Sequence, residues 1–260
     1  IKYIILTIRA DNQGEGGVFS LYALVRRYGK WLAIPTILGA TTLLADGIIT
    51  PPISVASAIE GLNSVKGLEH IIVPGNNLSI GIVIAIISAL FFFQRFGTQV
   101  VGSSFGPIMA IWFVMLFAVG AAQIAHYPDV LKAISPHYGY NLLVHYPHGF
   151  WLLGAVFLCT TGAEALYSDL GHCGIKNIRI TWIFVKLSLV TNYIGQAAWV
   201  MHQDRAYLQG VNPFFEMMPH WFLLPSILIA TAATIIASQA LISGSYTLIS
   251  EAMNLNFWPR

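Results

Sequence analysis

Six long apolar stretches divide the sequence and restrict its fold more than any other feature does. They cover residues 31–62, 71–93, 107–125, 150–167, 178–201 and 221–249, and residues 1–8 form a further apolar stub. A helix that crosses a bilayer needs about 20 mostly apolar residues, whereas the strands of a membrane barrel are about ten residues long and alternate in polarity. The stretches therefore predict an all-α, polytopic transmembrane helix bundle that forms a single membrane domain over residues 1–260.

Charged side chains are too few for a soluble domain of this length. They make up 9% of the 260 residues, against 56% apolar side chains, whereas soluble domains carry about 25% charged residues. The net charge of +2 is too small and too scattered for a nucleic-acid-binding protein. No metalloprotease HExxH motif or phosphate-binding loop is present. We therefore expect neither an enzyme nor a bound cofactor, and we expect the lipid bilayer to be the main surroundings of the chain.

Basic residues gather in alternate loops between the apolar stretches. One side of the predicted membrane receives Arg9, Arg26, Arg27, Lys30, Arg95, Lys176, Arg179 and Arg260, and the other receives Lys66, Lys132 and Arg205. Cytoplasmic loops are enriched in Lys and Arg. The asymmetry predicts a multi-pass protein of the cell membrane whose loop around Arg26 faces the cytoplasm.

Two acidic residues lie inside apolar stretches, where a charge costs about 2.5–3.5 kcal/mol and usually marks a functional site. Asp46 is in the middle of the first full stretch, and Glu164 is in the fourth. The helical period brings Thr50 onto the face of Asp46, with Ser54 farther round. The pair Pro51-Pro52 removes two backbone donors and leaves carbonyls for a cation. Alternatively, either acid could simply pair with Lys186, the one basic residue deep enough to reach them.

The surroundings of Glu164 suggest a broken helix. Thr161 and Gly162 directly precede the acid, and an interrupted helix in mid-membrane exposes carbonyl groups that coordinate cations in many transporters. Carboxylate, hydroxyl and carbonyl oxygens suit an alkali cation or a proton better than a transition metal. The candidate cation site therefore consists of Asp46, Thr50, Ser54, Thr161 and Glu164.

Several strings of the sequence, in chain order, resemble the KUP/HAK/KT potassium-uptake permeases. They are RADNQGEGG at residues 9–17, DGIITPPIS at 46–54, SAIEGL at 57–62, TGAEALYSDLGH at 161–172, NPFF at 212–215 and IASQALISG at 236–244. The resemblance extends across almost the whole chain. It implies a LeuT-like core of two inverted repeats, in which the stub is the end of family helix 2 and the six stretches are helices 3 to 8.

The resemblance also implies a function and assigns roles to residues. Asp46 and Thr50 match the family's cation-site positions on helix 3, with Ser54 nearby, and Thr161 and Glu164 match the broken helix 6. Potassium uptake across the bacterial inner membrane or plasma membrane, by symport with protons, is the implied activity, with potassium and protons as substrates rather than cofactors. The family's first helix, later helices and C-terminal region are missing. We therefore expect an internal fragment that is inactive alone and whose homodimer contacts lie in the missing regions.

Other function classes remain open at this stage. A transporter of the same fold for an organic substrate, such as an amino acid, would need a glycine-rich unwound site for a carboxylate, and the central acids argue against that. A membrane-embedded enzyme would need a nucleophile and a base close together. A passive channel would be expected to carry a repeated pore loop, which is not visible in the sequence.

Overall fold

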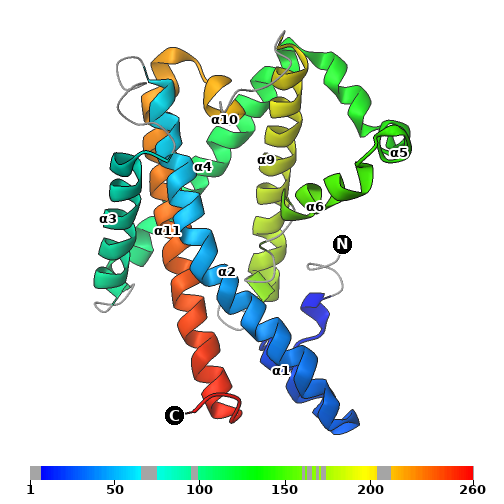
Figure 1. Ribbon diagram of the computed structural model, residues 1–260, viewed down its shortest axis with the longest axis vertical. Helices are drawn as coiled ribbons and strands as arrows, with labels where there is room; N and C mark the ends of the chain where they lie inside the picture. The colour runs from blue at the N-terminus through cyan, green and yellow to red at the C-terminus, as the bar shows by residue number, and fades with distance from the viewer. Residues whose placement is uncertain are drawn as a thin grey trace.

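The computed structural model describes residues 7–65, 75–94, 99–159, 162, 166–167, 170, 174–203 and 212–259. Apart from an isolated β-bridge between Asn12 and Glu15, the elements of these ranges are helices. The α-helices are α1 (Val18–Val25), α2 (Ala33–Glu60), α3 (Asn77–Gln94), α4 (Gln99–His126), α5 (Pro136–His145), α6 (Gly149–Cys159), α9 (Ile175–Met201), α10 (Pro213–Glu216) and α11 (His220–Asn254). The 3-10 helices are η2 (Thr7–Arg9), η3 (Arg26–Tyr28), η4 (Lys30–Leu32), η5 (Gly61–Ser64) and η6 (Pro128–Ile134). The predicted all-α bundle is confirmed (Figure 1).

Three stretches of helix within the described ranges are long and apolar enough to cross a membrane. They are Lys30–Ser64, Ser104–His126 and His220–Asn254. The helices α3 and α6 are apolar but shorter, and α9 carries three basic residues along its 27 residues. The helix α4 begins at Gln99, before the expected start at residue 107. Several apolar helices of this kind make the chain a multi-pass membrane protein, while the exact set of six spans stays a prediction.

The helices α2 and α11 pack antiparallel along much of their length (Figure 1). At one end of the pair Ala58 of α2 packs in a cluster with Ile227 and Ala230 of α11. At the other end Ala40 of α2 packs with Leu248 and Ala252. Small side chains let two helix backbones approach closely, which replaces the hydrophobic driving force that is absent in lipid. The packing of these two helices holds Asp46, in the middle of α2, in position.

The helices α4 and α9 run parallel and touch backbone to backbone. The ring of Phe113, near the middle of α4, contacts that of Phe184, with centroids 6.1 Å apart, and Tyr127 stacks on His202 where the two helices end, with centroids 3.8 Å apart. Between these ring pairs a Cβ atom added to Gly195 would lie 2.5 Å from Cα of Gly120. Glycine is therefore required at this crossing, because any side chain would force the helices apart.

We predict that Gly195→Ala destabilises the protein although alanine favours a helix by about 1 kcal/mol over glycine. Overpacking of a tight contact costs about 1–3 kcal/mol, and here the added methyl group meets backbone that cannot rotate away. Thermal unfolding of the purified intact protein in detergent should show a lower midpoint for Gly195→Ala. The control Gly106→Ala in α4, where an added Cβ meets nothing within 4 Å, should leave the midpoint unchanged or raise it. Equal midpoints for the two variants would contradict the close crossing.

Candidate cation site

Asp46 lies near the middle of α2, half-buried, with a hydroxyl group as its immediate partner. Thr50, one turn later, donates its Oγ1 hydroxyl to Oδ1 of Asp46 at 2.5 Å. Residues four apart meet on one face of a helix, and a hydrogen bond to a carboxylate is short and strong when the acceptor is charged. The predicted contact between these two residues is therefore present in the structure, and it presents two oxygen atoms side by side at mid-helix.

The proline pair beside Asp46 does not interrupt the helix. The helix α2 runs without a break from Ala33 to Glu60, with Pro51 and Pro52 inside it. Because proline has no N–H group, the carbonyls of Gly47 and Ile48 lack the donor that an ordinary helix supplies four residues later. The backbone oxygens of the two residues that follow Asp46 are therefore left without their usual helical partners.

Gly47, next to Asp46, brings α2 into close contact with α11. A Cβ atom added at Gly47 would collide with Oγ of Ser245, whose hydroxyl donates to the carbonyl of Leu241 at 2.9 Å. A larger residue at position 47 would require that hydroxyl to turn away from its acceptor. The peptide beside the acid is thus fixed against the α11 backbone.

Ser54, the further residue of α2 predicted for the site, and three other polar residues of this helix do not join the pair. Ser54 is half-buried and Ser57 is exposed. Thr42 is exposed and donates to carbonyls of its own helix, Leu38 and Gly39. Glu60 lines a mostly apolar hollow of about 400 Å³ between α2 and α3. Within the described part of α2, Asp46 and Thr50 are joined by a hydrogen bond between their side chains.

Glu164 and Thr161, the two other predicted ligands, lie outside the described residues. Their neighbours are informative: α6 ends at Cys159, and Gly162 has φ of 104°, in the left-handed region that favours glycine. Tyr193 of α9 donates its hydroxyl to the carbonyl of Cys159 at 3.0 Å and so satisfies one of the free carbonyls at the end of that helix. The convergence of Asp46 and Glu164 stays a prediction.

Two strings that carry the family resemblance lie together in space, a contact that we did not anticipate from the sequence. Tyr167, close after Glu164, donates its hydroxyl to the carbonyl of Ala10 at 2.6 Å. Gly16 packs so closely on Tyr167 that a Cβ atom there would collide with its carbonyl oxygen. Tyr167 and Leu170 also pack with Ile8 in one buried apolar cluster. The segment after Glu164 is therefore attached to the loop at residues 9–17.

The alternative in which Asp46 is neutralised by a lysine finds no support in the part of the chain that the structure describes. Lys186 is exposed on α9, and the ion pair found there joins Lys132 to Asp129 at 2.8 Å. That pair lies in η6, where the hydrogen bond from Lys132 lowers the pKa of the Asp129 carboxyl. Because both groups are fully exposed, the pair contributes little to stability.

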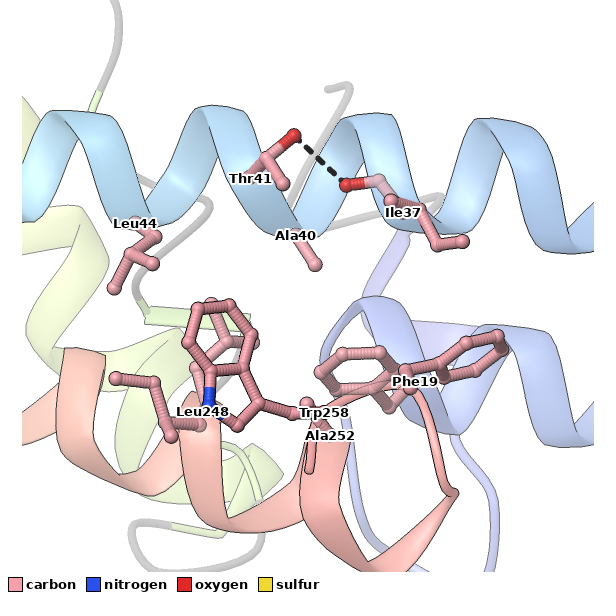
Figure 2. A pocket seen from close by; sticks show the side chains of 10 residues that line it. Phe19, Ile37, Ala40, Thr41, Leu44, Leu248, Ala252 and Trp258 are labelled. Carbon is pink, nitrogen blue, oxygen red and sulfur yellow. Dashed lines mark hydrogen bonds between the residues drawn. The ribbon is translucent and has the colours of Figure 1, made fainter. Parts of the chain in front are cut away.

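A small apolar hollow at the predicted cytoplasmic end of α2 and α11 is not a candidate cation site. Figure 2 shows Ala40 and Leu44 of α2 facing Leu248 and Ala252 of α11, with Trp258 and Phe19 beside them. The hollow measures about 60 Å³, and the hydroxyl of Thr41 at its edge donates to the carbonyl of Ile37 at 2.9 Å. Its lining therefore offers little to a charged ligand.

A string with the spacing Gly-x-Ser-x-Gly occurs at residues 102–106, but it carries no catalytic geometry. A nucleophile elbow places its serine on a sharp turn from a strand to a helix. Residues 102–106 lie inside the helix α4 instead. In the described ranges the structure also contains no group of three or more His, Cys, Asp or Glu residues suited to a metal ion.

Comparison with known proteins decides the family. The model of the K+ potassium transporter integral membrane domain matches residues 1–260, the whole chain. The chain belongs to this family. It is 60% identical over its full length to a probable potassium transport system protein Kup of Cytophaga hutchinsonii, and 56% identical to that of Flavobacterium johnsoniae. It is 54% identical to the protein of the same name from Clostridium perfringens.

The match covers only part of these relatives. The chain spans 39% of the Cytophaga protein and 40% of the Flavobacterium and Clostridium proteins. No solved structure matches the chain. The family resemblance predicted from the sequence is thus confirmed, and the names of the relatives give no support to an organic substrate.

Proposed function

We propose that the intact protein takes up potassium ions and that Asp46 and Thr50 form part of the site that binds the ion. The observation that carries this proposal is a carboxylate and a hydroxyl in contact at 2.5 Å near the middle of an apolar helix. An acid in such a position is costly and usually serves an ion or proton pathway. Relatives that are 54–60% identical to this chain over the matched residues are named potassium transport proteins, which supports potassium as the ion.

The oxygen atoms near Asp46 suit a weakly held monovalent cation. A potassium ion entering the membrane exchanges water for protein oxygens, and the Asp46 carboxylate supplies the negative charge. The Thr50 hydroxyl donates to that carboxylate in this structure, and its lone pairs are available to a cation. The carbonyl of Ile48, which lacks its helical donor because residue 52 is proline, adds a further oxygen. We propose that Ser54, Thr161 and Glu164 complete the site.

Proton coupling follows if Asp46 and Glu164 share one site. Two carboxylates in a dehydrated cavity repel each other, which favours protonation of one of them. A proton carried on one acid and a potassium ion held by the other would then cross together. Rocking of one group of helices against another, the usual mechanism of transporters with inverted repeats, would expose the site alternately to the two sides.

We predict that Asp46→Asn and Glu164→Gln each reduce rubidium uptake by cells that depend on the intact protein. A charge-assisted contact is worth about 1.5–3 kcal/mol, and 1.4 kcal/mol corresponds to tenfold in affinity, so a fall of about tenfold or more is expected at low rubidium. The matched control is Asp129→Asn, which removes an exposed acid from η6 and should leave uptake unchanged. Normal uptake by both variants would refute the site assignment, and absence of uptake by the unaltered protein would refute the function.

Proton coupling has its own test. Proteoliposomes that contain the intact protein should accumulate rubidium faster when the external solution is made acidic relative to the interior at fixed membrane potential, because each ion would enter with a proton. A protonophore should abolish the difference. Uptake that follows the membrane potential but ignores the pH gradient would identify a channel or uniporter instead.

A further inference from the structure

The contact between α2 and α11 contains a buried hydroxyl without a partner. The Oγ atom of Ser238 makes no hydrogen bond with any described residue, although the side chain is only 1% exposed. Most serine hydroxyls inside membrane helices donate to a carbonyl of their own helix, as Ser245 does to Leu241 and Ser226 does to Leu223. A buried polar group left unpaired is costly, and natural proteins usually satisfy it with protein or with ordered water.

Ser238 lies on the face of α11 that contacts α2. It is the first member of a stripe spaced three and four residues apart, which continues as Leu241, Ser245, Leu248 and Ala252. Residues with this spacing face one neighbouring helix. The later members of the stripe contact Gly47 and Ala40 of α2.

The register of the two helices places Ser238 opposite Pro51. Gly47 meets Ser245 and Leu241, and Ala58 packs with Ile227 and Ala230. Because the helices run antiparallel, Ser238 lies between these two contacts, at the level of Pro51. Pro51 is itself buried, so it faces the same contact.

Pro51 leaves an unpaired acceptor on this face. The carbonyl of Gly47 lacks the N–H group that residue 51 would otherwise donate, and residue 52 is also proline and offers no substitute. Gly47 and Pro51 are one turn apart and both are buried. A hydroxyl donor on α11 without a partner and a carbonyl acceptor on α2 without its helical donor therefore lie in the same stretch of the helix contact.

We propose that an ordered water molecule binds between α2 and α11 at this level, accepting a hydrogen bond from Ser238 and donating one to the carbonyl of Gly47. Water commonly satisfies the backbone groups that proline frees in membrane helices, and buried waters typically make about three hydrogen bonds. Two neutral oxygens are too few to replace the hydration shell of a cation, so water fits this site better than potassium does. This site is distinct from the Asp46–Thr50 pair and does not depend on the proposed function.

X-ray hydroxyl-radical footprinting of the intact protein in lipid nanodiscs tests this proposal, because radicals formed from a bound water oxidise the side chains next to it. Pro51 and Ile242, both buried beside Ser238, should be labelled faster than Ile227, which is equally buried in the apolar cluster. Ser238→Ala should remove the excess labelling of Pro51 and Ile242 and bring both to the rate of Ile227, because the water loses a partner.

Two control variants separate loss of water from general disturbance of α11. Ser238→Thr keeps the hydroxyl and should keep the labelling. Ser226→Ala removes a buried hydroxyl that already donates to Leu223 at 2.7 Å and should change nothing at Pro51. Labelling of Pro51 and Ile242 no faster than that of Ile227, or unaffected by Ser238→Ala, would overturn the proposal.

Discussion

The cost of placing a carboxylate in the middle of a membrane helix is the constraint on which the account rests. Asp46 has no basic partner among the described residues, and its carboxylate accepts a hydrogen bond from the hydroxyl of Thr50 at 2.5 Å. A hydrogen bond lowers that cost but does not remove the charge. This cost supports the proposal that the Asp46–Thr50 pair is half of a binding site whose positive charge arrives with a transported ion.

Close helix contacts hold this site in position. Gly47 fixes the peptide beside Asp46 against α11, and Gly120 and Gly195 let α4 and α9 touch through their backbones. At the other candidate position, Tyr193 holds the end of α6 and Tyr167 attaches the following segment to Ala10. Small residues at crossings and hydroxyls at helix ends are thus the features that determine where the polar groups lie in this apolar bundle.

The sequence predicts the class of fold and one contact of the candidate site. The contacts that it does not predict were missed for physical reasons. Apolar length and scarce charge suffice for an all-α membrane bundle, and the helical period suffices for the Asp46–Thr50 contact, because both are local properties. The contact of Tyr167 with Ala10 joins residues 157 positions apart, and no local pattern indicates it. The sequence does not indicate the missing hydrogen bond of Ser238 either, because a serine stripe in a membrane helix usually indicates helix packing.

The most direct test of the central claim is to locate the ion itself. We would determine the structure of the intact protein in rubidium and find the ion from its anomalous scattering. The account predicts a rubidium peak in direct contact with the Asp46 carboxylate, with the Glu164 carboxylate facing the same cavity. An ion bound away from Asp46, or the two carboxylates on opposite sides of the bundle or turned toward lipid, would contradict it.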